Sequence, residues 1–327
     1  MQQAFLGGLN ALERATTPSV VTIGSFDGVH LGHQQILARL TAKAQALGAA
    51  STVIIFEPQP QEYFAKAPTS PRLMRLREKV TALLAAGVDR VVCLRFNQRL
   101  SSLSAEAFVR QVLVDGLSVK HLEIGDDFRF GCDRQGDFAY LQQAGAEWGF
   151  SVANSETYVQ GEERVSSTRI RQVLAEHRLA DASALLGKPY AIAGRVVYGR
   201  QLGRTIGVPT ANIGLGRYAP AVNGVYAVTA SWQGRKLQGV ANVGVKPTVG
   251  AAPKPLLEVH FFDFAENLYG DCLNVQFCQA LRAEKKFDSL DALKAQIQTD
   301  IEQAKQYFAS ASSDAPALGN SLYSPEN

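Results

Sequence analysis

The residues best suited to chemistry lie in one early run, Gly24-Ser25-Phe26-Asp27-Gly28-Val29-His30-Leu31-Gly32-His33. Residues three positions apart, as His30 and His33 are, share one face of a helix. A helix start offers unpaired N–H groups and the positive end of its dipole. Imidazole donors there, among glycines that let backbone approach closely, predict a phosphate site. Singly, each histidine also fits a surface turn. Metal binding by the two is an alternative, although no nearby Cys or Glu completes a ligand set.

A second candidate anion site is the run Ser166-Ser167-Thr168-Arg169-Ile170-Arg171. Three hydroxyls at a helix start, followed by two guanidinium groups, are typical of a phosphate cradle. Taken alone, the run fits an N-cap with surface arginines equally well. Its functional interpretation therefore depends on the histidine run.

A third candidate lies in the second half, Gly203-Arg204-Thr205-Ile206-Gly207-Val208-Pro209-Thr210-Ala211-Asn212. The hydroxyl of Thr210 and the amide of Asn212 suit a hard cation that also binds phosphate oxygens. The alternative is a proline-initiated entry into a strand. A Walker A loop does not occur in the sequence.

Alternating strand and helix patterns fill residues 19–186. Strands are predicted at 20–23, 52–56, 90–94, 121–124 and 150–153, with helices between them, two of which Ser104 and Asp137 would cap. This order favours an α/β, doubly wound parallel sheet, which binds ligands at the carboxyl ends of its strands. Glu57 and Pro58 follow the second strand, and Asp127 and Phe128 follow the fourth.

The pattern changes after Gly187-Lys188-Pro189. Apolar runs at 192–197, 225–231, 237–243, 257–262 and 273–277 predict a closed or sandwiched antiparallel sheet. A helix should begin near Asp288, with one apolar face. That face would comprise Leu290, Leu293, Ile297, Ile301, Ala304 and Phe308. We predict domains at 1–186 and 187–308, followed by a disordered tail at 309–327.

Composition narrows the class of protein. The 327 residues are 46 % hydrophobic, which excludes a disordered chain, a collagen-like chain and a coiled-coil rod. The 33 basic and 30 acidic residues nearly cancel, so nucleic acid is not the expected partner. We find no signal peptide and no apolar run of about 20 residues, and the four cysteines are scattered. These features predict a cytoplasmic protein without a membrane partner, as a monomer or weak oligomer.

The histidine run resembles the signature of the HIGH-type nucleotidyltransferases, and its Phe-Asp-Gly form is similar to that of the flavin adenylyltransferases. The resemblance implies that Gly24, Phe26, Asp27, Gly28, His30 and His33 bind ATP, with both histidines catalytic. It implies that Ser166, Ser167, Thr168, Arg169 and Arg171 clamp the triphosphate. It also implies that Glu57, Pro58, Asp127 and Phe128 bind the flavin. Gln59 departs from the family pattern, in which His is common.

The run ending at Asn212 resembles the Pro-Thr-Ala-Asn signature of riboflavin kinases, which occupies a six-stranded barrel. The resemblance implies phosphate binding by Gly199, Gly203, Arg204, Thr210 and Asn212, with Thr210 also on Mg²⁺. It implies that Glu258 is the catalytic base and that Gly224, Tyr226 and Arg282 contact the flavin. Tyr198 stands where the family frequently has His.

Both motif sets follow the order of the bifunctional riboflavin kinase/FMN adenylyltransferase family, over about residues 19–308. The resemblance implies that riboflavin is phosphorylated to FMN and then adenylylated to FAD, with ATP and Mg²⁺ in both steps. One alternative is a monofunctional nucleotidyltransferase whose barrel only binds ligand. The other is a nucleic-acid-binding protein built on a synthetase-like core, which the balanced charge disfavours.

Overall fold

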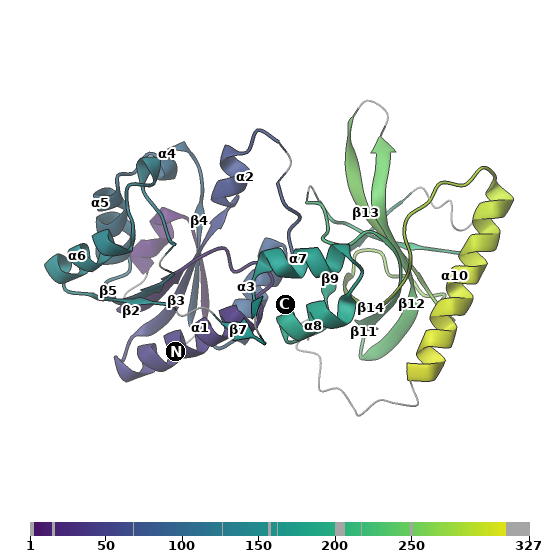
Figure 1. The fold of residues 1–327 in the computed structure, drawn as a ribbon, viewed down its shortest axis with the longest axis horizontal. Helices are drawn as coiled ribbons and strands as arrows, with labels where there is room; N and C mark the ends of the chain where they lie inside the picture. The colour runs from purple at the N-terminus through teal and green to yellow at the C-terminus, as the bar shows by residue number, and fades with distance from the viewer. Residues whose placement is uncertain are drawn as a thin grey trace. The chain divides into compact units, whose positions relative to one another are not determined.

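The computed structural model forms two compact units (Figure 1). It describes residues 3–14, 17–67, 69–125, 127–155, 158–161, 163–199, 207–216, 218–248 and 251–311. The first unit holds residues 1–70 and 74–166, and the second holds residues 71–73 and 167–327. Within the described ranges, no helix combines the length and apolarity needed to cross a bilayer.

The first unit is built on a six-stranded parallel sheet. Its strands are β1 (Ala4–Gly7), β2 (Ser19–Ile23), β3 (Ala50–Glu57), β4 (Arg90–Arg95), β5 (Val119–Ile124) and β6 (Ser151–Asn154), in the order β1-β4-β3-β2-β5-β6. A separate two-stranded ribbon pairs β7 (Val159–Gln160) with β8 (Glu163–Arg164). The predicted α/β parallel sheet is confirmed, with the edge strand β1 added.

Helices cover both faces of this sheet. They are α1 (Leu31–Ala46), α2 (Pro60–Phe64), α3 (Leu76–Ala85), α4 (Gln98–Ser101), α5 (Ala105–Phe108) and α6 (Phe138–Trp148), with 3-10 segments at Leu9–Arg14 and Cys132–Arg134 and a π-helical turn at Val109–Val114. Successive β2 residues face opposite layers, since Val20 packs with Leu37 of α1 and Val21 with Leu141 of α6. The predicted caps form: Ser104 Oγ accepts from the Ala107 amide, and Asp137 Oδ1 from the Tyr140 amide.

The second unit is a closed antiparallel barrel of six strands, as predicted. The strands are β9 (Ala191–Val197), β10 (Ala211–Ile213), β11 (Gly224–Trp232), β12 (Arg235–Thr248), β13 (Ala251–Phe261) and β14 (Cys272–Arg282), in the order β10-β13-β12-β11-β14-β9. Two helices precede it, α7 (Ser167–Ala175) and α8 (Leu179–Leu186). Ile170 and Leu179 pack in the same core as the barrel interior, so this compact unit begins before the predicted domain start at 187.

The helix α10 (Leu290–Ala311) lies along the outside of the barrel, over β11, β12 and β14 (Figure 1). Ile301, Ala304 and Phe308 pack against Val225 and Val240 there, as the apolar pattern predicts. Leu290 was expected on this face, but its side chain is 56 % exposed because it stands at the first position of the helix. The predicted tail lies outside the described residues from 312 onward.

Candidate functional sites

The strand order places two predicted motifs at the same point of the parallel sheet. The chain runs from β2 to β3 and β4 on one side and then returns to pair β5 on the other side of β2. Ligands bind at such a reversal, outside the carboxyl ends of the strands. The histidine run leaves the end of β2, and Asp127 and Phe128 follow the end of β5. The topology thus brings together motifs about one hundred residues apart in sequence.

His30 and His33 form a stacked pair at the start of α1. Their ring centroids are 3.6 Å apart, with 18° between the planes. Nδ1 of His30 caps the helix by accepting from the backbone N–H of His33 at 3.3 Å. Because Nδ1 accepts, the proton of the neutral ring belongs on Nε2. Nδ1 of His33 is buried and has no hydrogen-bond partner in the described part of the chain.

Both imidazoles are held neutral. The pKa of His30 is lowered from 6.5 to about 4, chiefly by burial, with Asp27 opposing the shift and the positive charge of Arg164 adding to it. Burial also lowers the pKa of His33 well below its usual value, together with the neighbouring His30 and Lys79. At pH 7 the pair therefore offers N–H donors without net charge. Lys79, a buried residue of α3, thus influences the histidine pair, although the sequence analysis did not single it out.

The turn before α1 has a strained backbone that supports the pair. Phe26 and Val29 have φ values of 45° and 43°, which non-glycine residues rarely adopt. The ring of Phe26 lies 4.9 Å from that of His33 and also against Gly24, where an added Cβ would meet it at 3.0 Å. Strain of this kind is kept where surrounding structure enforces it, commonly at functional sites.

Asp27 fixes the same turn to the segment before α3. Its side chain is 1 % exposed, and Oδ1 accepts from the backbone N–H of Met74 at 3.0 Å. Gly28, the next residue, has a φ of 90°. Asp27 therefore fixes the turn that leads to His30, and its buried carboxylate opposes the lowering of the His30 pKa.

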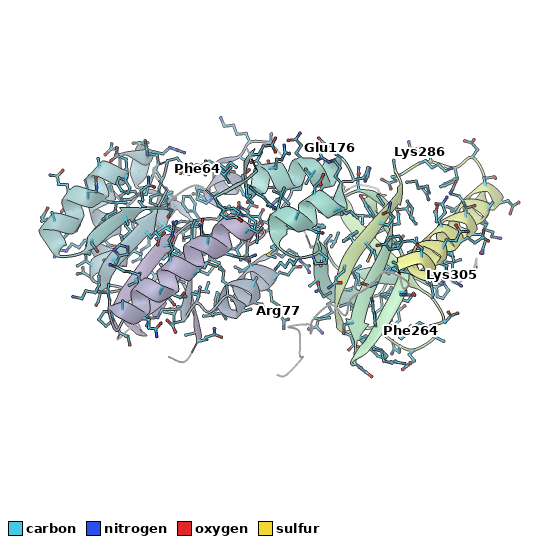
Figure 2. The ribbon with its side chains drawn as sticks, turned by 60° about the horizontal axis from the view of Figure 1, so that its bottom comes forward. Phe64, Arg77, Glu176, Phe264, Lys286 and Lys305 are labelled. Atoms are coloured by element: carbon cyan, nitrogen blue, oxygen red, sulfur yellow. The ribbon has the colours of Figure 1, made fainter. Side chains whose placement is uncertain are left out.

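The loop after β3 stands beside an aromatic cluster that the sequence analysis missed. Glu57 and Pro58 lead into α2, whose Phe64 contacts Phe96 edge-on at a centroid distance of 5.7 Å. Phe64 is 64 % exposed and lies at the surface of its unit (Figure 2). Exposed aromatic faces at a ligand edge suit a flat ring. The available signal was two aromatics, at 63 and 64, directly after a Pro-rich turn.

The loop after β5 turns tightly. The N–H of Phe128 donates to the carbonyl of Gly125 at 3.1 Å, and the side chain of Asp127 folds over Gly125. Phe128 stacks on the buried ring of Phe130 at 5.5 Å, with 16° between the planes. Phe130 is thus a core residue, while Phe128 is only partly buried.

The predicted triphosphate clamp opens α7. Ser166 ends the first compact unit, and the residues from Ser167 to Arg171 form the first turn and a half of α7 in the second unit. Nε of Arg171 donates to the carbonyl of Pro71 at 2.6 Å. The predicted functional role of this run continues to rest on the sequence.

The barrel register aligns the predicted kinase residues on its outer face. Asn212 of β10 pairs with Glu258 of β13, which pairs with Asn242 of β12; the row then continues through Val225 of β11 to Arg282 of β14. Neighbouring residues on these strands belong to the barrel core, so the row itself faces outward. Positions 212 and 258 thus become neighbours, and position 282 lies on the same row, three strands away from 258.

Asn212 and Gly199 also meet directly. The side-chain amide of Asn212 is buried and occupies the space that a Cβ on Gly199 would fill. Thr210 precedes β10, whereas Gly203 and Arg204 lie outside the described residues. The donors here are a hydroxyl, an amide oxygen and the carboxylate of Glu258, which are the oxygen ligands that Mg²⁺ prefers.

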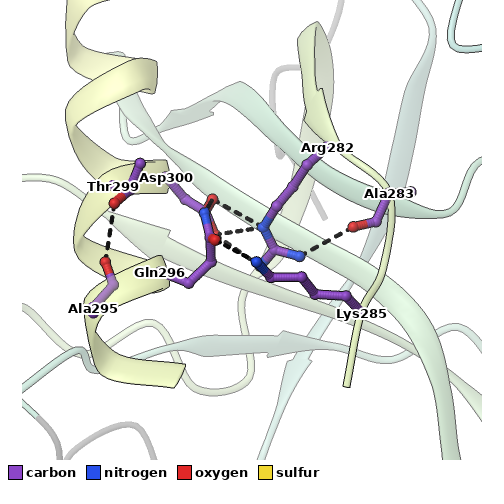
Figure 3. A network of polar contacts seen from close by, with 7 residues as sticks. All are labelled: Arg282, Ala283, Lys285, Ala295, Gln296, Thr299 and Asp300. Carbon is purple, nitrogen blue, oxygen red and sulfur yellow. Dashed lines mark hydrogen bonds and ion pairs between the residues drawn. The ribbon is translucent and has the colours of Figure 1, made fainter. Parts of the chain in front are cut away.

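Arg282 is fixed by α10 in a polar network (Figure 3). Its guanidinium donates to Asp300 through Nε at 2.9 Å and through Nη2 at 2.8 Å. Gln296 donates to the same carboxylate at 2.9 Å and accepts from Nζ of Lys285 at 2.6 Å. Asp300 is 2 % exposed and was not singled out from the sequence, because it stands within an apolar helix face.

Two predicted flavin contacts of the barrel have different surroundings. Gly224 has a φ of 105°, and an added Cβ would lie 2.6 Å from the carbonyl oxygen of Arg282. Tyr226 is fully buried, and its hydroxyl donates to the carbonyl of Asn223 at 2.6 Å. Burial raises its pKa to about 12. A flavin contact by the side chain of Tyr226 stays a prediction.

Comparison with known proteins places both units in families. A model of the FAD synthetase family matches residues 12–169, and a model of the riboflavin kinase family matches residues 186–308. A bifunctional riboflavin kinase/FMN adenylyltransferase from Pseudomonas fluorescens is 51% identical, over 92% of this chain and 97% of its own. The protein of that name from Escherichia coli K12 is 48% identical, over 93% and 97%. A crystal structure described as a macrolide-efflux protein from Streptococcus pneumoniae superposes with a TM-score of 0.76 at 29% identity, covering 93% of this chain and 99% of that one.

Proposed function

The chain belongs to the bifunctional riboflavin kinase/FMN adenylyltransferase family, and from this premise we propose which residues perform the two reactions. The enzyme phosphorylates riboflavin with ATP to FMN, and it adenylylates FMN with ATP to FAD and pyrophosphate. Riboflavin, FMN, FAD and ATP are therefore its substrates and products. The observation that best supports two separate sites is that each unit has its own polar arrangement: the stacked histidines in one, and the Asn212–Glu258 pair in the other.

We propose that adenylyl transfer occurs at the switch point of the parallel sheet. A phosphate oxygen of FMN attacks the α-phosphorus of ATP, and pyrophosphate leaves. Nε2–H of His30 donates to a phosphate oxygen while its Nδ1 stays bound to the cap, so the donor is held in one orientation. His33 supplies a second donor, and the helix N-terminus stabilises the added negative charge. The backbone of Gly24 and Gly28 would border the nucleotide.

We propose that FMN lies across the carboxyl ends of β3 and β5. Glu57 and Pro58 border its ring on one side, and Asp127 and Phe128 on the other. The exposed face of Phe64 supplies additional stacking surface. Ser166, Ser167, Thr168, Arg169 and Arg171 remain the proposed ligands of the triphosphate, because α7 begins with hydroxyls and presents two guanidinium groups in its first turns.

For the kinase, we propose that Glu258 takes the proton of the riboflavin hydroxyl as the hydroxyl oxygen attacks the γ-phosphorus of ATP and ADP leaves. Asn212 and Thr210 orient the triphosphate, with Gly199, Gly203 and Arg204 beside them. Gly224 and Arg282, at the other end of the outer row, contact the flavin. Tyr226 supports that end from inside the barrel.

Mg²⁺ fits the oxygen donors of the kinase site. Thr210 would hold it together with ATP oxygens, and it would neutralise charge on the phosphates when bound. Among the described residues, no group of three or more His, Cys, Asp or Glu side chains is arranged to hold a metal alone. That agrees with the usual Mg²⁺ site, in which substrate supplies part of the coordination. We propose Mg²⁺ for both reactions, and cytoplasmic location and a monomeric or weakly oligomeric state stay predictions.

One pair of variants tests the two sites within a single protein. His30→Ala should lower FMN adenylylation by about 10²–10³-fold and leave riboflavin phosphorylation unchanged. Glu258→Gln should do the reverse. Chromatography of flavins after incubation with riboflavin, ATP and Mg²⁺ separates the two products. Loss of both activities in either folded variant would contradict the assignment of separate sites.

A further inference from the structure

One hydrogen bond connects the proposed catalytic strand of the kinase to its phosphate-binding segment. Nδ1 of His260, on β13, lies 2.8 Å from the carbonyl oxygen of Pro209. A carbonyl only accepts, so Nδ1 carries the proton. His260 stands two residues after Glu258 and therefore on the same outer face of the strand. Pro209 directly precedes Thr210.

The position of this bond has a structural cause. The ladder between β10 and β13 ends at the pair Ala211–Val259. Thr210 lies one residue beyond this end, and Pro209 beyond it has no backbone N–H to donate. The side chain of His260 therefore takes over where backbone pairing stops. This bond ties the segment that carries Thr210 to β13 one residue beyond the end of the ladder.

Both partners of the bond are supported from the side. The backbone of His260 pairs with Val240 of β12. Its ring lies 6.1 Å from that of Phe262, which packs on the apolar cluster under α10. Val208, beside Pro209, packs on the same cluster. The bond thus joins a supported ring on β13 to the segment that carries Thr210.

We propose that His260 is a positioning residue of the riboflavin kinase reaction, holding Thr210 in register with Asn212 and Glu258 through the carbonyl of Pro209. The inference rests on the proposed function of Thr210 and Asn212. His260 itself touches no reacting atom in this scheme. Its contribution is to keep the triphosphate side of the site aligned with the base.

Two variants of nearly equal shape isolate the donor. In His260→Asn, the amide nitrogen stands at the place of Nδ1 and still donates, whereas His260→Leu has no donor. We expect His260→Leu to lower kcat/KM for ATP roughly tenfold, mainly through KM, with KM for riboflavin unchanged. His260→Asn should stay within about twofold of the unchanged chain. FMN adenylylation by the same molecules is the internal control, and Glu266→Gln, which removes an exposed ion pair with Arg235, is the control for substitution in this unit.

A second measurement needs no turnover. Hydrogen exchange of the backbone amides at 207–213 in the unliganded protein should be faster in His260→Leu than in His260→Asn. The inference fails if His260→Leu retains full kinase efficiency, if His260→Asn is as impaired as His260→Leu, or if adenylylation falls equally. Thr210→Ala, assayed in parallel, distinguishes a failure of the proposed kinase site from a failure of the role of His260. Unchanged kinase activity in Thr210→Ala contradicts the proposed site, whereas a defective Thr210→Ala beside a normal His260→Leu contradicts only the role of His260.

Discussion

Acidification should destabilise the N-terminal unit through His30. Its pKa is about 4 in the folded chain and 6.5 in the unfolded chain, so the unfolded state binds a proton first as pH falls. The stabilisation that depends on a neutral His30 is fully present above pH 6.5 and is lost as the pH falls toward 4. At pH 5 the unfolded state gains a factor of about 30 in population, equivalent to about 2 kcal/mol of unfolding free energy. The buried His33 shifts in the same direction and adds to the loss.

The matched variant for this prediction is His30→Asn, which removes the titration and keeps a side chain that caps helices well. The chain has two tryptophans, and Trp232→Phe leaves Trp148, in α6, as the reporter of the N-terminal unit. Urea unfolding followed by Trp148 fluorescence at pH 8 and pH 5 should show about 2 kcal/mol more loss with His30 than with Asn. An equal loss in both backgrounds, or an NMR titration midpoint of His30 near 6.5, would refute the reasoning.

Three further predictions concern the barrel and the requirement for a metal ion. Asp300→Ala leaves Arg282 largely buried without its counter-charge, so unfolding of this unit, followed by Trp232 fluorescence with the other tryptophan replaced, should lose about 3 kcal/mol. An unchanged unfolding midpoint in Asp300→Ala would show that the Arg282–Asp300 ion pair contributes nothing to the stability of this unit. Gly199→Ala should lower kinase activity about tenfold or more, because its Cβ displaces the amide of Asn212, while adenylylation stays normal. Chelation of divalent cations should stop both reactions, and added Mg²⁺ should restore both; turnover in excess chelator would argue against metal dependence.

Local sequence patterns were sufficient to predict a feature where its residues lie close together in the sequence. The histidine run required only the spacing of two imidazoles and a helix start, and the structure places both at the N-terminus of α1. The caps at Ser104 and Asp137 are equally local, since each side chain bonds to an amide three residues on. The short strand β1 was not predicted, and β10 was anticipated only as the alternative interpretation of the run ending at Asn212, because three or four residues give too little periodicity to detect.

Helical periodicity shows that a face is buried but not what buries it. The pattern of α7 and α8 suggested a continuation of the first unit, yet Ile170 and Leu179 pack in the core of the barrel. In the same way, Asp300 lies among apolar residues of α10 that cover the barrel, and only its contact with Arg282 explains a carboxylate there. Packing partners distant in the chain are not encoded in local spacing.

The sequence by itself determined the two fold classes, the order of the motifs and the residues able to bind phosphate, because each depends on short-range spacing and residue type. The tertiary structure decided which of them meet. Strand order places the segments after β2 and β5 side by side, and barrel register sets Asn212 opposite Glu258. The tertiary structure also joins His260 to Pro209 and lowers the pKa of His30. The first effect requires a neighbour distant in the sequence and the second requires burial, and only the folded chain provides them.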